Sequence, residues 1–305
     1  ALQNIQGSMI ERIEVITNPS ARYEAEGMAG IINIVLKKEQ QKGVNGSFEA
    51  TLGYPENYSL GANVNFRREK VNYFINYNIR YRENTGSGNS YQHFMLADTG
   101  YYTLIDRTRY RSGLSNQIRG GFDYFLNSKS TITASFLFSC ENQLNTTNLV
   151  YDDYSESLTD PLSPDELLIK TFREDREDET EKDIQASLMY EKIFNKPEHK
   201  LTFLALYDSD KDLEKSDIEE TVSGSNSSLL QRSENGEGER NLLIQTDYNR
   251  PFGDKGNFEA GYRSEFRDIT NPYRVEEVDS LGNWYRLENY SNDFEYIENV
   301  HALYV

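Results

Sequence analysis

The sequence predicts an all-β protein in which about ten antiparallel strands form part of a transmembrane β-barrel, preceded by a short N-terminal unit. Two observations support this fold class: alternation of apolar and polar residues, and a rhythm of short and long connections. The alternation is clearest from Val71 to Arg82, where valine, isoleucine and tyrosine fall on one face. Asparagine and arginine fall on the other face, with Phe74 as the exception. Such a strand suits a wall between lipid and water.

The composition agrees with a membrane barrel. Mean hydropathy is -0.74 and 27% of the residues are charged, and no run approaches the roughly 18 apolar residues that a spanning helix needs. A membrane helix is therefore excluded, whereas barrel strands alternate in polarity and are never apolar on average. The 22 tyrosines and 15 phenylalanines would supply the two aromatic girdles of a barrel.

The connections predict both the strands and their orientation. We predict strands near residues 44–54, 58–68, 71–83, 110–125, 130–142, 183–194, 200–212, 241–250, 257–268 and 293–305. Tight links (69–70, 126–129, 195–199 and 251–256) alternate with long ones (84–109, 143–182, 213–240 and 269–292), except for a short first hairpin near Pro55. Outer-membrane barrels have short periplasmic turns and longer extracellular loops, so the long links should lie outside the cell.

Acidic residues are concentrated in the long links. Residues 143–182 hold 12 acids and 4 bases, which makes this segment a large contributor to the net charge of -18. One interpretation is a solvated surface whose repulsion keeps loops open. The other is a field that attracts cationic or metal-bearing ligands, or divalent ions that bridge to lipopolysaccharide. Nucleic acid is not expected as a partner, because binding of phosphates requires clustered lysine and arginine.

One acidic pattern is a candidate calcium site. Asp208, Asp210 and Asp212 alternate along the chain and Glu219 follows eleven residues after the first, which echoes the spacing of calcium ligands in an EF-hand. Leu213 stands where that loop requires glycine, so the sharp turn is missing. The alternative is an acidic rim without bound metal.

Aromatic residues in the long links are candidate ligand contacts. Tyr101, Tyr102, Trp284 and Tyr285 could stack on a sugar or a siderophore. Equally, they could pack within their own loops.

No catalytic constellation is present in the sequence. His93, His199 and His301 lie in different segments without the spacing of zinc ligands, and the single cysteine, Cys140, has no histidine or carboxylate beside it. We therefore expect neither enzyme activity nor a cofactor.

Residues 10–38 form a different kind of unit. Ile13 and Val15 alternate with charged residues as in a strand, while Gly27 and Gly30 permit a sharp reversal before a second apolar strand at 31–36. The residues that define the motif are Glu11, Arg12, Glu14, Pro19, Gly27, Gly30 and Asn33.

This motif resembles the last part of the plug domain of TonB-dependent outer-membrane receptors, most closely those of the Bacteroidetes type, although Asn18 stands where many relatives carry glycine. The resemblance implies that residues 1–40 are the C-terminal part of a plug and residues 41–305 the first part of a barrel of 22 strands. It also implies energy-coupled import of a siderophore, glycan, peptide or similar ligand. The implied partner is a TonB-type complex, which would act through a segment absent from this chain.

Two other functions remain open at this point. A non-transporting outer-membrane barrel that serves as an adhesin or surface scaffold would share every strand feature without needing the plug residues. A secreted sandwich that binds carbohydrate would share the alternation but not the rhythm of short and long connections. Both the receptor and the non-transporting barrel would lie in the outer membrane, with the lipid bilayer as partner. The secreted sandwich would not.

Overall fold

The computed structural model describes residues 10–16, 31–36, 42–96, 99–156, 165–196, 198–225, 228–253 and 256–305. Nearly all of them lie in strands. The elements are β1 (Ile10–Ile16), β2 (Ile31–Leu36), β3 (Gly43–Gly53), β4 (Asn57–Arg67), β5 (Val71–Leu96), β6 (Thr99–Asn127), β7 (Ser130–Glu156), β8 (Glu166–Ile193), β9 (Lys200–Val222), β10 (Ser228–Phe252), β11 (Gly256–Val278), β12 (Trp284–Arg286), a 3-10 turn (Glu288–Tyr290) and β13 (Asn292–Tyr304).

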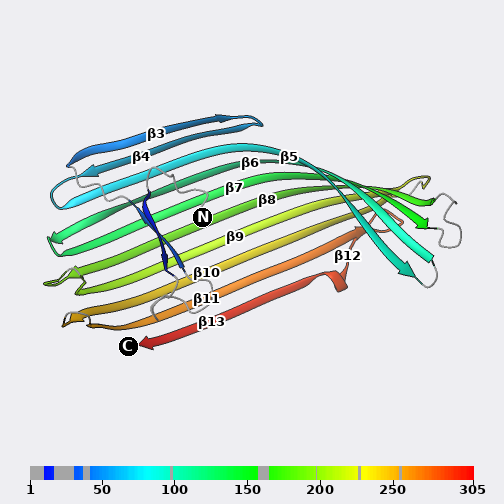
Figure 1. Ribbon diagram of the computed structural model, residues 1–305. Helices are drawn as coiled ribbons and strands as arrows, with labels where there is room; N and C mark the ends of the chain where they lie inside the picture. Colours follow the sequence, from blue (N-terminus) through cyan, green and yellow to red (C-terminus); the bar gives the residue numbers. More distant parts are fainter. Residues whose placement is uncertain are drawn as a thin grey trace.

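Strands β3 to β13 form one antiparallel sheet of eleven strands, drawn as a curved wall in Figure 1. Each long strand pairs with its neighbours in the chain, and the short β12 and the longer β13 both pair with β11. This nearest-neighbour meander confirms the predicted order. A two-layer sandwich is wrong for the described residues, because Tyr73 (52%), Ile75 (47%) and Tyr77 (40%) are exposed rather than buried between sheets.

The continuous register gives the sheet two chemically different faces. Tyr73 lies opposite Phe122, which lies opposite Ala134, which in turn lies opposite Leu188. We call this side the apolar face and the opposite side, which holds Asn76, the polar face. Residues of the apolar face include Val71, Tyr73, Ile75, Tyr77, Ile79, Leu114, Ile118, Phe122, Ile132, Phe136, Phe138, Ile184, Leu188, Tyr207, Leu242 and Phe266.

The apolar residues cover only a band, whose upper limit shifts from strand to strand. On β6 the band extends from Tyr124 up to Leu114, whereas on β8 it ends at Ile184 and on β10 at Leu242. Barrel strands cross a bilayer at a tilt of about 35–45°, so a level membrane surface meets successive strands at different residues. On β5 and β6 the apolar stretch is about ten residues long, which matches the height of a lipid-facing band.

The predicted long loops are wrong in form. Residues 84–109, 143–182 and 213–240 are mostly strand, since β5 continues to Leu96, β6 starts at Thr99, and β7 to β10 are 23–28 residues long. Each pair keeps its ladder beyond the apolar band, as in Glu83 opposite Ser112 and Leu96 opposite Thr99. The extension occurs because backbone groups in water are satisfied by continuing an existing ladder as well as by solvent. The short first hairpin, β3 to β4, is as predicted.

Phe74, the apolar exception on the polar face, has a local reason. It lies directly opposite Gly121 on β6, and its ring covers the glycine. A Cβ added to Gly121 would come within 2.6 Å of the Phe74 Cζ and 2.9 Å of the Ser135 Cα. The aromatic ring therefore fills the space that a side chain at 121 would occupy, an arrangement known to support glycines in sheets.

The N-terminal unit is a hairpin with its own sheet. β1 pairs only with β2, with Ile13 opposite Ile34 and Glu14 opposite Asn33, so neither strand extends the large sheet among the described residues. Figure 1 shows the hairpin as a separate piece with its strands running across the direction of the large sheet. Pro19, Gly27 and Gly30 lie outside the described residues, and the assignment of Glu11, Arg12 and Glu14 to a plug stays a prediction. Within the described residues, no helix is both long enough and apolar enough to span a bilayer.

Candidate functional site

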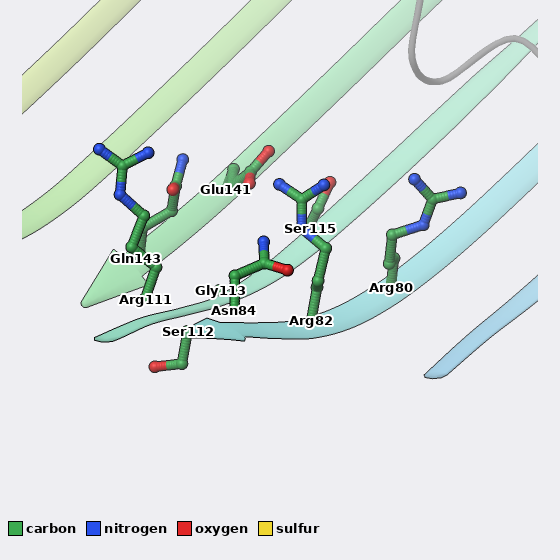
Figure 2. A pocket seen from close by; sticks show the side chains of 9 residues that line it. All are labelled: Arg80, Arg82, Asn84, Arg111, Ser112, Gly113, Ser115, Glu141 and Gln143. Carbon is green, nitrogen blue, oxygen red and sulfur yellow. The ribbon is translucent and has the colours of Figure 1, made fainter. Parts of the chain in front are cut away.

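The polar face carries a basic region on β5 and β6. Alternate residues share a face of a strand, which places Arg80 and Arg82 of β5 beside Arg111 of β6. These three arginines line a pocket of about 80 Å³ together with Glu141 and Gln143 of β7. Figure 2 shows the three guanidinium groups projecting from the same side of the sheet, with Ser112 pointing away from it.

Small residues make room for this pocket. Gly113 lies opposite Arg82, and Ser115, which is buried, lies opposite Arg80. On the far side of β6, Gly113 faces Gln143 and Ser115 faces Glu141. The long side chains of β5 and β7 can therefore extend over β6 toward one another.

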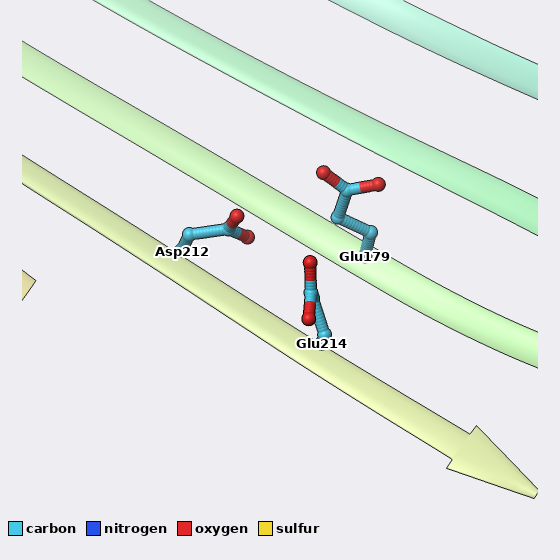
Figure 3. Close-up of side chains that lie close together, drawn as sticks. All are labelled: Glu179, Asp212 and Glu214. Carbon is cyan, nitrogen blue, oxygen red and sulfur yellow. The ribbon is translucent and has the colours of Figure 1, made fainter. Parts of the chain in front are cut away.

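An acidic region occupies the same face on β8 and β9. The register sets carboxylates directly opposite one another: Asp183 faces Asp210, Glu181 faces Asp212, and Glu179 faces Glu214. Like charges opposite one another destabilise a ladder, so three such pairs in succession work against the pairing of β8 with β9. Figure 3 shows the Asp212 and Glu214 side chains of β9 extending toward Glu179 of β8.

This crowding changes the acidity of the groups above the apolar band. Partial burial, followed by the charges of Asp212 and Glu214, raises the pKa of Glu179 to about 7. Burial and the charge of Glu214 also raise the pKa of Asp212 above its ordinary value. Glu179 therefore keeps its proton at pH values where an isolated glutamic acid is ionised.

The raised pKa predicts a pH dependence of stability. Between pH 4.5, the ordinary pKa of a glutamic acid, and about 7, Glu179 binds more protons in the folded than in the unfolded state, so stability falls as pH rises through this range. Glu179→Gln should raise the free energy of unfolding at pH 8 by up to about 1 kcal/mol, because the solvent-accessible group is screened, and change little at pH 5. Thermal unfolding in detergent at both pH values measures this.

A control comes from the other face of the same strand. Asp178 lies opposite Lys215, so Asp178→Asn removes one charge without relieving repulsion. This variant should show the wild-type loss of stability between pH 5 and pH 8. If Glu179→Gln keeps the same loss, the acidic region is not its source.

The candidate calcium set is not gathered as predicted. Asp208 and Asp210 lie near Asp183, with carboxylate oxygens within 4.8 Å of one another, and Asp212 lies near Glu179 and Glu214. Glu219 is an odd number of residues from all three aspartates on a regular strand, so it falls on the apolar side of the sheet. Carboxylates often gather on a surface without an ion, and we assign no metal to either group.

The candidate aromatic contacts pack within their own hairpins. The Tyr102 ring stacks on Tyr154 with centroids 4.9 Å apart, and its hydroxyl donates to Asp165 at 2.8 Å. Tyr101 stacks on Phe94 at 5.6 Å. Both tyrosines lie at the start of β6, and no ring contact among the described residues joins either of them to Trp284 or Tyr285.

The β12 pair is held in the same way. Arg232 lies over the Trp284 ring at 4.4 Å from the centroid, and the Tyr285 hydroxyl donates to Glu277 at 2.9 Å. Both rings remain partly exposed. They lie on β12, the last strand in the order of the sheet.

The basic pocket was not predicted from the sequence as a site. Its signal was present as arginines at alternate positions, 80 and 82 on one strand and 107, 109 and 111 on the next. Residues 84–109 were assigned to a loop, so Arg107 and Arg109 had no predicted face and the register that brings Arg111 to Arg82 was missing.

The family comparison agrees with the fold. Residues 192–305, which contain the last two residues of β8 and strands β9 to β13, match the model of the outer membrane protein beta-barrel family. A search among curated proteins finds no match to the sequence. The match, together with a single antiparallel sheet that carries an apolar band of bilayer height, assigns the protein to the outer membrane.

Proposed function

We propose that the protein is a receptor that imports a ligand across the outer membrane with energy supplied by a TonB-type complex. The observation that carries this proposal is the β1–β2 hairpin, which precedes the large sheet and pairs with none of its strands among the described residues. Its sequence resembles the end of a plug. A separately folded unit at the start of a barrel is suited to block the lumen until work is done on it.

The polar face supports the same proposal. If the sheet closes into a barrel, the polar face would line the lumen, and its arginines and carboxylates would favour a water-filled channel. A barrel that serves only as a surface scaffold has no need of two oppositely charged regions on the lumenal side. The long strand extensions fit either a receptor or a scaffold, because both present a surface to the outside.

The test is the dependence of import on the proton-motive force. Cells that express the intact protein receive siderophores, glycans and peptides in turn, with and without a protonophore. For the imported substrate, accumulation should fall at least about tenfold when the gradient is dissipated, while binding to the cell surface stays within a few-fold, because only movement of the plug requires work. A variant that lacks residues 10–36 is the matched control, in which accumulation should become independent of the protonophore.

Two outcomes would contradict the proposal. Accumulation at the normal rate in protonophore-treated cells would indicate a passive pore. Surface binding without accumulation of any substrate would favour the adhesin or scaffold.

A further inference from the structure

The pocket formed by Arg80, Arg82 and Arg111 holds positive charge that nearby carboxylates do not neutralise. Among the described residues, none of the three makes an ion pair within 4 Å, and this includes Glu141, which lines the same pocket. Glu83 follows Arg82 in β5 and lies opposite Ser112, the residue after Arg111. Its side chain is on the apolar face, where the Tyr81 hydroxyl donates to it, and so on the opposite side of the sheet from the arginines.

The donors of this pocket are also incompletely used. The Arg80 Nε is buried and has no hydrogen-bond acceptor within the described structure. The Arg82 Nε lies 3.3 Å from the Asn84 amide, whose oxygen accepts when the amide is rotated to its better orientation. A buried N–H of a charged group without an acceptor is costly, so an acceptor brought by a ligand would be strongly favoured.

We propose that this pocket binds an oxyanion group, a carboxylate or a phosphate, of an anionic ligand. Guanidinium groups present paired N–H donors whose geometry matches both groups. A volume of about 80 Å³ has room for two or three waters at roughly 30 Å³ each, and therefore for one such group rather than a whole ligand. The remainder of the ligand would extend over the open polar face.

The overall charge sharpens the inference. A chain with a net charge of -18 repels anions in general, so binding of an anion requires a local cluster of cations. The acidic region of β8 and β9 lies on the same face and would exclude the anion from that side. The inference adds an anionic ligand class to the proposed import function. Binding of the anion does not depend on that function, whereas import of the bound ligand rests on it.

The test uses inorganic phosphate and citrate as probes with the intact protein purified in detergent at low ionic strength. Calorimetric titration should show binding of at least one probe to the wild type. Arg82→Gln and Arg111→Gln should each weaken it about tenfold, as expected for loss of one charge-assisted contact worth roughly 1.4 kcal/mol. Binding of phosphate alone, or of citrate alone, identifies which oxyanion the pocket accepts.

Two further variants distinguish binding in the pocket from a general effect of positive charge on the polar face. Arg107→Gln removes the same charge from the same face of β6, outside the pocket, and should change affinity less than twofold. Gly113→Leu should abolish binding with all arginines present, because its side chain would enter the pocket. The added Cβ comes closest to the flexible Gln143 Cγ, at 3.2 Å, and lies at ordinary contact distances of 3.5 Å from the Asn142 carbonyl oxygen and 3.7 Å from the Glu141 Oε1, so the backbone should accept it.

Equal weakening by Arg107→Gln and Arg82→Gln, or no binding of either probe at millimolar concentration, would overturn the inference. Binding is measured without an energy source. Its failure therefore leaves protonophore-sensitive import unaffected, and a failure of import leaves probe binding intact.

Discussion

Ile118→Arg should destabilise the membrane-inserted protein by about 2–4 kcal/mol, the cost of an arginine at the middle of a lipid-facing wall. Ile118 stands near the centre of the apolar band on β6, between Tyr77 of β5 and Phe138 of β7. A guanidinium at this point finds no carboxylate on the neighbouring residues of its face, where the Tyr77 hydroxyl already donates to Asn116, and it must displace lipid contacts. Folding into lipid vesicles at increasing urea concentration measures the loss.

The matched control is Ser139→Arg, at the same height on the polar face. Ser139 pairs with Gln117, the residue before Ile118, and is two residues from Glu141. An arginine there gains water and a nearby carboxylate, so its effect should stay below about 1 kcal/mol. If the two variants lose stability equally, the apolar face is not the lipid-facing one.

Gly121→Val should have the second largest effect, because β6 has no space for a side chain at this position. The added Cβ would overlap the Ala134 carbonyl oxygen and approach the Phe74 ring to 2.6 Å. The ring can rotate, but the carbonyl belongs to the ladder between β6 and β7 and cannot move without breaking it. Overpacking of this kind costs roughly 1–3 kcal/mol, measurable in the same urea titration.

Gly88→Val controls for the change of residue type. Gly88 also lies on the polar face of a paired strand, but a Cβ there has no atom within 4 Å. This variant should be neutral or slightly stabilising, since valine favours strands. The two variants together test whether Phe74 and Gly121 form one packed unit, in which case Phe74→Ala should relieve part of the cost at Gly121 but leave the carbonyl overlap.

The parts of the strands within the apolar band could be predicted from the sequence, because lipid on one face and water on the other impose alternation of apolar and polar residues. Val71 to Arg82 shows this plainly. Beyond the band both faces meet water, and the alternation fades in segments such as residues 84–89, which contain glycine, serine and asparagine. Those residues have low strand propensity, and their pairing follows from a register that was fixed nearer the turns.

The candidate sites depended on that register and so were only partly predictable. Asp208, Asp210 and Asp212 stand at alternate positions in the sequence and share one face of β9, but their neighbours Asp183 and Glu179 come from another strand and are identified only by the strand pairing. Glu219 was grouped with them by a loop spacing that a strand does not follow. The arginine pocket likewise joins two segments whose alignment no local pattern encodes.

In a receptor that imports its ligand as proposed, the strand extensions would separate capture of the ligand from its passage. Residues 99–113 of β6 lie above the apolar band, a reach of roughly 50 Å at about 3.3 Å per residue. Because these segments are hydrogen-bonded ribbons, they resist folding down over the barrel mouth as free loops would. A ligand of such a receptor that first touches the tips would still be several nanometres from the bilayer. It would then have to move along the strands, and the proposed anion site at the base of the extensions would be the second place at which it binds.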